Sequence, residues 1–232
     1  MISKMANIRL TEIAKMVKKG VRAADIGTDH ALLPILLIQD HTCCKVYACD
    51  IASGPLQAAK ENIAKAGLSS RIETILSDGL QNVPEDADAC IIAGMGGMNA
   101  LDIMNHADGR IACMKQIIIE VNRDTYKVRE WISEHQYTIE DEIYINDRRH
   151  DYTAISFIPK EHSPYSREEL LLGPILIKKK DPSYLSYCLK QKKKIEKILA
   201  DICRLKADQS SNDELQCNLK IYKEFLKNKK NV

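Results

Sequence analysis

The chain has 232 residues, of which 45% are hydrophobic and 28% charged, and its formal net charge is +2. This length fits one α/β domain with an appendage better than two large domains. The composition is that of a folded chain and not of a disordered one. Apolar runs such as residues 31–38 are far shorter than the roughly 20 residues that cross a bilayer, and the first ten residues lack the apolar segment of a secretion signal. We therefore expect a cytoplasmic protein without a membrane partner.

The cysteine pattern points to the same compartment. The sequence holds eight cysteines, without a Cys-x-x-Cys pair or a paired zinc-ligand spacing. Most of them lie in apolar runs, so we expect reduced thiols in the core and no metal site.

Charge is distributed unevenly along the chain. Residues 1–159 carry a formal charge of −5 and residues 160–232 one of +7. The basic part is suited to a polyanion, and the acidic part to a neutral or cationic ligand. Charge alone leaves a second interpretation open, in which the basic part is only a solvated lysine-rich helix.

Hydrophobic periodicity predicts alternating strands and helices through most of the chain. Helices are expected at residues 9–20, 31–40, 53–66 (capped by Ser53 and ended by Gly67), 98–104 and 124–135, and strands at 21–27, 45–50, 71–76, 87–93 and 115–121. Such alternation indicates a parallel sheet with helices on both faces. Residues 137–145 and 151–158 read as an antiparallel hairpin with its turn at 146–150, which closes the sheet.

Beyond a linker that contains Pro164, the pattern becomes helical. Apolar residues keep heptad-compatible steps in two segments, at Cys188, Ile195, Ile198, Ile202 and Leu205, then at Leu215, Leu219, Tyr222 and Leu226. We predict a coiled-coil helical hairpin over residues 161–232, following an α/β domain over residues 1–160.

Candidate ligand-binding residues follow the predicted strands, because ligands of parallel α/β sheets bind at the carboxyl ends of the strands. Asp25 and Gly27 end the first strand, and Asp50 ends the second. A glycine there permits close approach of a ligand, and an acid after the second strand can accept both hydroxyls of an adenosine ribose. These residues predict a nucleoside cofactor.

The first loop departs from the dinucleotide pattern Gly-x-Gly-x-x-Gly. Asp29 and Ala31 stand where glycines are expected, and a carboxylate repels a diphosphate. The loop therefore favours S-adenosylmethionine, which is cationic and has no diphosphate. A plain helix cap at Asp29 and a buried turn at Gly27 form the structural alternative.

Two more strand ends carry suitable residues. Asp78 and Gly79 follow the third strand, where a carboxylate can accept the adenine amino group, although Asp-Gly is also an ordinary turn. Residues 94–97, Gly-Met-Gly-Gly, follow the fourth strand and permit close approach of a planar substrate to the backbone.

These segments together resemble the bacterial tRNA (adenine-22) N1-methyltransferase family. The resemblance is carried by Arg9-Leu10 and by residues 24–34, 50–55, 77–80, 92–97 and 172–174. It implies a Rossmann-like class I methyltransferase sheet, S-adenosylmethionine as the cofactor, tRNA as the substrate and a C-terminal coiled-coil hairpin. Residues 120–122, Glu-Val-Asn, depart from the glutamine–proline–asparagine that the family leads us to expect.

The resulting hypothesis is methyl transfer to N1 of adenine 22 in the D-arm of tRNA, with positioning as the main source of rate enhancement. Catalytic candidates, which stabilise the charge that develops on the base, are Asp29, Gly94, Met95 and Gly96. Candidates for cofactor binding are Asp25, Gly27, Asp29, His30, Asp50, Ile51, Asp78, Gly79 and Gly94. Candidates for tRNA binding are Arg9, Lys178, Lys179, Lys180, Lys192, Lys193 and Lys194.

Two other functions remain open at this stage. A nicotinamide-dependent oxidoreductase is supported by Asp50 and opposed by the missing glycines. A non-catalytic adaptor would use the helical hairpin to bind a protein. We expect a monomer or a weak dimer in each case.

Overall fold

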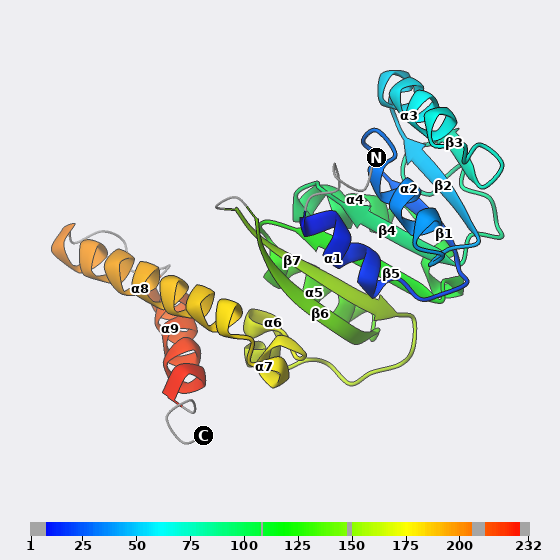
Figure 1. Cartoon of the computed structure of the whole chain (residues 1–232). Coiled ribbons are helices and arrows are strands. Elements are labelled where there is room, and N and C mark those ends of the chain that lie inside the picture. Colours follow the sequence, from blue (N-terminus) through cyan, green and yellow to red (C-terminus); the bar gives the residue numbers. More distant parts are fainter. Residues whose placement is uncertain (1–7, 108, 148–149, 206–211, 228–232) are drawn as a thin grey trace. The chain divides into compact units, whose positions relative to one another are not determined.

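The structure, a computed structural model, describes residues 8–107, 109–147, 150–205 and 212–227, and it divides into two compact units, Met1–Tyr165 and Ser166–Val232 (Figure 1). The first unit contains a seven-stranded sheet in the order β3-β2-β1-β4-β5-β7-β6. Its strands are β1 (Arg22–Ile26), β2 (Lys45–Asp50), β3 (Ile72–Leu76), β4 (Ala89–Ala93), β5 (Gln116–Val121), β6 (Thr138–Asp147) and β7 (His150–Ile158). Its α-helices are α1 (Ile8–Met16), α2 (Leu32–Gln39), α3 (Ser53–Lys65), α4 (Gly97–Asn105) and α5 (Thr125–Glu134), with a short 3-10 helix η2 (Arg110–Cys113).

The sheet topology confirms the predicted architecture. β3, β2, β1, β4 and β5 pair in parallel, and β7 pairs antiparallel with both β5 and β6. Helices α1, α2 and α3 cover one face and α4 and α5 the other (Figure 1). The strand order reverses between β1 and β4, and Ile26 of β1 pairs with both Cys49 and Ile92. Ligands of open α/β sheets bind at such a switch point, outside the carboxyl ends of the strands.

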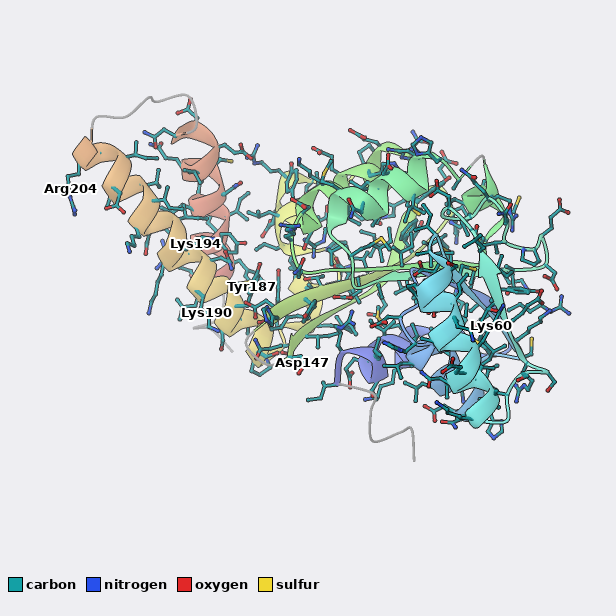
Figure 2. The ribbon with its side chains drawn as sticks, turned by 90° about the horizontal axis from the view of Figure 1, so that it is seen from above. Lys60, Asp147, Tyr187, Lys190, Lys194 and Arg204 are labelled. Carbon is teal, nitrogen blue, oxygen red and sulfur yellow. The ribbon has the colours of Figure 1, made fainter. Side chains whose placement is uncertain are left out.

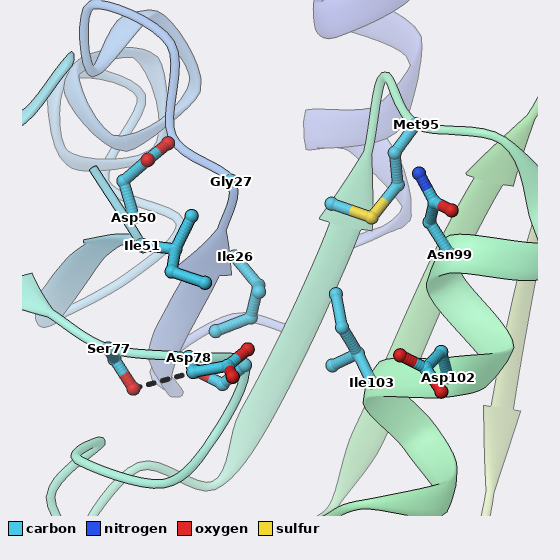
Figure 3. Close-up of a pocket in the computed structure, with 11 residues that line it drawn as sticks. Ile26, Gly27, Asp50, Ile51, Ser77, Asp78, Met95, Asn99, Asp102 and Ile103 are labelled. Carbon is cyan, nitrogen blue, oxygen red and sulfur yellow. Dashed lines mark hydrogen bonds between the residues drawn. The ribbon is translucent and has the colours of Figure 1, made fainter.

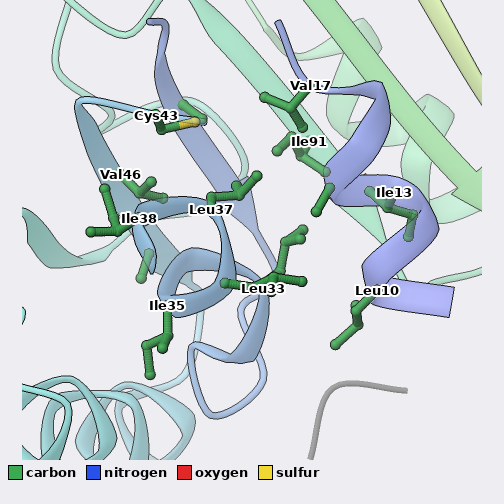
Figure 4. Close-up of a cluster of buried hydrophobic side chains, with 14 of the residues drawn as sticks. Leu10, Ile13, Val17, Leu33, Ile35, Leu37, Ile38, Cys43, Val46 and Ile91 are labelled. Carbon is green, nitrogen blue, oxygen red and sulfur yellow. The ribbon is translucent and has the colours of Figure 1, made fainter. Parts of the chain in front are cut away.

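The core next to this switch point is built around α2. This helix has the sequence LLPILLIQ and buries every residue from Leu33 to Ile38. It is apolar on all sides because it lies between the sheet and α1, as Figure 4 shows for Leu37, Ile13 and Ile91. Full burial of each such side chain contributes about 1.5–3 kcal/mol, so the packing of α2 stabilises this part of the sheet.

Three details of the sequence prediction for this unit are wrong. The residue that caps α3 is Ala52 and not Ser53, and no side chain caps the helix. β6 and β7 extend through Asp147 and from His150, so the predicted turn at 146–150 is shorter, because Asn146 pairs with Asp151 in the ladder. Of the cysteines in this unit, which are all free thiols, Cys44 and Cys113 are exposed and not in the core.

The second unit consists of helices α6 (Arg167–Leu172), α7 (Leu176–Lys179), α8 (Pro182–Leu205) and α9 (Asn212–Lys227). The two long helices confirm the predicted helical pair; residues 206–211, which join them in the sequence, lie outside the described residues. The sequence prediction missed α6, which begins with a capping box between Ser166 and Glu169. In α9, Tyr222 and Phe225 are buried, whereas the expected apolar position Leu226 is only partly buried.

The first unit ends at Tyr165, five residues beyond the predicted boundary at 160. The Tyr165 hydroxyl accepts a hydrogen bond from Ile139 N–H at 2.8 Å, and Tyr165 N–H donates one to Ser133 Oγ at 2.9 Å. These bonds hold the segment after β7 on the first unit.

Candidate active site

A cavity of about 330 Å³ lies at the carboxyl ends of the strands, at the switch point. It is lined by Ile26, Gly27, Asp50, Ile51, Ser77, Asp78, Gly79, Met95, Asn99, Asp102 and Ile103. Figure 3 shows Asp50 and Ile51 on one wall, with Met95, Asn99 and Ile103 facing them. This cavity, called the cofactor cavity below, brings together predicted residues from the ends of four strands, β1 to β4.

The cofactor cavity is acidic. Asp50, Asp78 and Asp102 line it, and the described residues of its wall include no lysine or arginine. One oxygen of Asp50 accepts a hydrogen bond from Ala52 N–H at 2.8 Å, which orients the carboxylate. Such a wall attracts a cation and repels a diphosphate.

Gly27 brings the backbone of the first loop close to Met95. It has a φ of +76°, and a Cβ at this position would lie 2.9 Å from Met95 Cε. The amides of Gly27 and Thr28 both donate to Cys49 O, at 2.9 and 2.8 Å. The loop is thus tied to the end of β2 in a conformation that favours glycine.

A second cavity of about 320 Å³ lies on the other side of Met95. It is lined by Arg9, Gly94, Met95, Gly96, Glu120, Asn122, Arg123 and Tyr152, and we call it the acceptor cavity. Met95 borders both cavities. The two cavities therefore adjoin at this residue.

Buried charges organise the wall of the acceptor cavity. Glu120 is fully buried, and its Oε2 accepts hydrogen bonds from Arg9 Nη1 at 2.6 Å and from Gly94 N–H at 2.9 Å. Burial raises the pKa of Glu120, while Arg9 and the Gly94 amide lower it. The Arg9 guanidinium also lies 5.4 Å from the centre of the Tyr152 ring. Helix α1 thus holds the Gly94 loop through one shared carboxylate oxygen.

Asp25 lies behind the cavities and lines neither of them. Only 6% of it is exposed. Burial raises its pKa from 3.8 to about 6, although the Thr28 hydroxyl and the charge of Arg9 both lower it. Its geometry is that of a support for the first loop.

Most of the predicted site residues of the first unit line one of the two cavities, but not all of them do. Gly27, Asp50, Ile51, Asp78 and Gly79 line the cofactor cavity, and Gly94, Met95, Gly96 and Arg9 line the acceptor cavity. Asp29 and His30 line neither; the side chain of Asp29 is 84% exposed and lies 3.3 Å from His30 Nε2. His30 and Ala31 both adopt a positive φ in this loop. Because Asp29 lines neither cavity, the geometry gives no support to its predicted role beside the developing charge.

Sequence reasoning missed several lining residues. One face of α4 contributes Asn99, Asp102 and Ile103 to the cavity. Their helical spacing of three to four residues, soon after the glycine loop, could have identified them in the sequence. Arg123 follows the predicted strand at 115–121 and could have been found from its position, whereas Tyr152 could not, because it reaches the site only through the antiparallel pairing of β7 with β5.

The predicted basic residues lie in the second unit, except for Arg9. Lys178, Lys179 and Lys180 are exposed at the end of α7, and Lys193 and Lys194 are exposed on α8. Lys192 differs, because it pairs with Glu196 at 3.6 Å. Sequence reasoning missed Lys190 and Lys197, which are exposed and share a face of α8 with Lys194; Figure 2 shows Lys190 and Lys194 along this helix.

In the described part of the chain, no set of three or more His, Cys, Asp or Glu side chains is placed to hold a metal ion. None of the helices described there is both long and apolar enough to span a membrane.

The sheet order and the acidic cavity at its switch point define a Rossmann-like methyltransferase. The chain belongs to the methyltransferase domain family, whose sequence pattern matches residues 6–155.

Comparison with individual proteins narrows the resemblance. A Bacillus subtilis (strain 168) protein named tRNA (adenine(22)-N(1))-methyltransferase is 29% identical over 225 residues, 94% of each chain. The crystal structure of the B. subtilis m1A22 tRNA methyltransferase TrmK superposes with a TM-score of 0.85 at 27% identity, covering 95% of this chain and 98% of that one. The structure of M. capricolum TrmK in complex with S-adenosylhomocysteine gives a TM-score of 0.81 at 29% identity, over 96% of this chain and 98% of that one. The resemblance carried by the sequence motifs is thereby confirmed.

Proposed function

We propose that this chain transfers a methyl group from S-adenosylmethionine to N1 of adenine 22 in tRNA. One observation carries the proposal: an acidic cavity suited to a cationic nucleoside and a polar cavity suited to a base adjoin at Met95. The names of the similar proteins support the substrate and the position.

The residues of the cofactor cavity fit S-adenosylmethionine. Three carboxylates suit its cationic groups, and Asp50 keeps one oxygen free of the Ala52 amide for the ribose hydroxyls. Exposed Ile51, at 69% relative exposure, offers an apolar surface for the adenine ring. When bound, this cofactor supplies an activated methyl group on a sulfonium.

The acceptor cavity positions the base for the reaction. Adenine N1 is unprotonated at neutral pH, so no general base is needed. Transfer forms the N1–CH₃ bond, breaks the S–CH₃ bond and moves one positive charge from sulfur to the base. Tyr152 offers a ring for stacking, and Arg123 offers a guanidinium to the nucleotide phosphate. Holding N1 and the methyl carbon about 3–3.5 Å apart supplies much of the rate enhancement.

We also propose that basic residues of the second unit bind the rest of the tRNA. Exposed Lys178–Lys180 and the lysines of α8 suit phosphate contacts, which position the substrate without reading its sequence. Extrusion of a stacked base costs a few kcal/mol, which these contacts offset. We place this reaction in the cytoplasm, with the protein acting as a monomer or weak dimer.

Mass spectrometry of the product nucleoside tests the proposal. Purified protein is incubated with labelled S-adenosylmethionine and unmodified tRNA that has adenosine at position 22, and a matched tRNA with guanosine 22 is the control. We expect 1-methyladenosine at position 22 of the first tRNA only. Label at another position would overturn the assigned site, and a nicotinamide cofactor that binds in place of S-adenosylmethionine would favour the oxidoreductase.

A further inference from the structure

The second oxygen of Glu120 is the feature that the proposed function leaves unexplained. Oε2 accepts two hydrogen bonds, from Arg9 and from Gly94. Oε1 is buried and has no hydrogen-bond partner in the described structure. Because an unmet buried acceptor is costly, such an atom in the wall of a cavity suggests a donor on the ligand.

The position of Glu120 limits what that donor can be. Register pairs Glu120 with Ala93, so the carboxylate lies beside the Gly94 loop in the wall of the acceptor cavity. The donor is therefore carried by the base that the proposed function places in this cavity. Adenine has one such group next to N1, the exocyclic amino group at C6, whereas guanine and hypoxanthine present an oxygen there.

We propose that Glu120 Oε1 accepts a hydrogen bond from the exocyclic amino group of the target adenine, and so selects this base and stabilises its methylated form. This inference rests on the proposed function. After methylation the positive charge is shared by N1 and the amino nitrogen, so the bond to the carboxylate strengthens as the charge develops. Glu120 thus performs the role that the sequence prediction assigned to Asp29.

Glu120→Gln tests the proposal with little change of shape. The two donors on Oε2 retain the amide oxygen, so the amide NH₂ takes the place of Oε1 and opposes the adenine amino group. Each protein is assayed on two tRNAs assembled from synthetic halves, one with adenosine and one with purine riboside at position 22. Purine riboside keeps N1 and lacks the amino group. Its different intrinsic reactivity cancels when the two proteins are compared.

We expect wild-type kcat/KM to fall at least tenfold more than that of Glu120→Gln when the amino group is removed. Glu134→Gln, at an exposed position of α5, is the control and should behave as wild type. Calorimetric binding of S-adenosylmethionine reports whether the variant folds. An equal loss in both proteins overturns the inference and leaves the proposed function intact. If the variant does not fold, wild-type protein that methylates purine riboside as fast as adenosine overturns it, and if wild type methylates neither tRNA, the proposed function and the inference both fail.

Discussion

Replacing Gly27 with alanine tests the close approach of the first loop to Met95. At a φ of +76°, the left-handed conformation destabilises a folded protein with alanine at this position by about 1–2 kcal/mol. Alanine also lowers the conformational entropy of the unfolded chain, which stabilises the folded state by about 0.4–1 kcal/mol. The net destabilisation from the backbone alone is therefore at most about 1.5 kcal/mol. The new Cβ also lies 2.9 Å from Met95 Cε, so the methionine must move into one of the cavities that it borders.

Gly20→Ala is the matched control for this substitution. Gly20 has a φ of +81°, and nothing lies within 4 Å of the Cβ position. Both variants should lower the melting temperature by a few degrees, since a domain of this size shifts about 2–4 °C per kcal/mol. Only Gly27→Ala should weaken S-adenosylmethionine binding, by about tenfold, as measured by isothermal titration calorimetry. Equal cofactor affinity in the two variants would refute the reasoning.

Three further predictions follow from the charges. Because the folded-state pKa of Asp25 is about 6 and not 3.8, its protonated form favours folding, and stability should fall by about 3 kcal/mol as pH rises from about 4 through 6. Asp25→Asn should remove that part of the pH dependence in urea unfolding, and an unchanged profile would contradict the assignment. Asp50→Asn should raise the Kd of S-adenosylmethionine by about 10–100-fold, because a hydroxyl acceptor of the ribose loses its charge; an unaltered Kd would remove Asp50 from the site. Replacing Lys190, Lys194 and Lys197 with glutamine should weaken tRNA binding and reduce the salt slope by up to about 3, whereas Lys60→Gln on α3, labelled in Figure 2, should change neither quantity in filter-binding titrations.

Local sequence patterns are sufficient to predict most of the strands and helices of the fold. The strand of residues 45–50 is found with its predicted bounds, since a short apolar run next to Gly, Pro and Asp turns has one favourable solution. The short helix α6 was missed, although its capping box at Ser166 and Glu169 was visible in the sequence. Ser53 was taken as a cap by residue type alone, whereas capping depends on the backbone geometry at Ala52.

The site was predictable where its residues lie at the ends of the parallel strands. Gly27, Asp50 and Asp78 each follow a parallel strand, and parallel strands bring their carboxyl ends to one edge, so the cofactor cavity can be inferred from strand order. The methyltransferase class and its acidic cofactor cavity were therefore contained in the order of the residues along the chain.

The acceptor cavity depends on tertiary structure. Its wall combines Arg9 of α1, Glu120 of β5 and Tyr152 of β7, which are far apart in the sequence. Neither periodicity nor spacing relates these residues, because the antiparallel return of β7 beside β5 and the packing of α1 bring them together. Burial also sets the chemistry of Glu120: folding removes this side chain from water, binds one of its oxygens to Arg9 and leaves the other without a hydrogen-bond partner among the described residues.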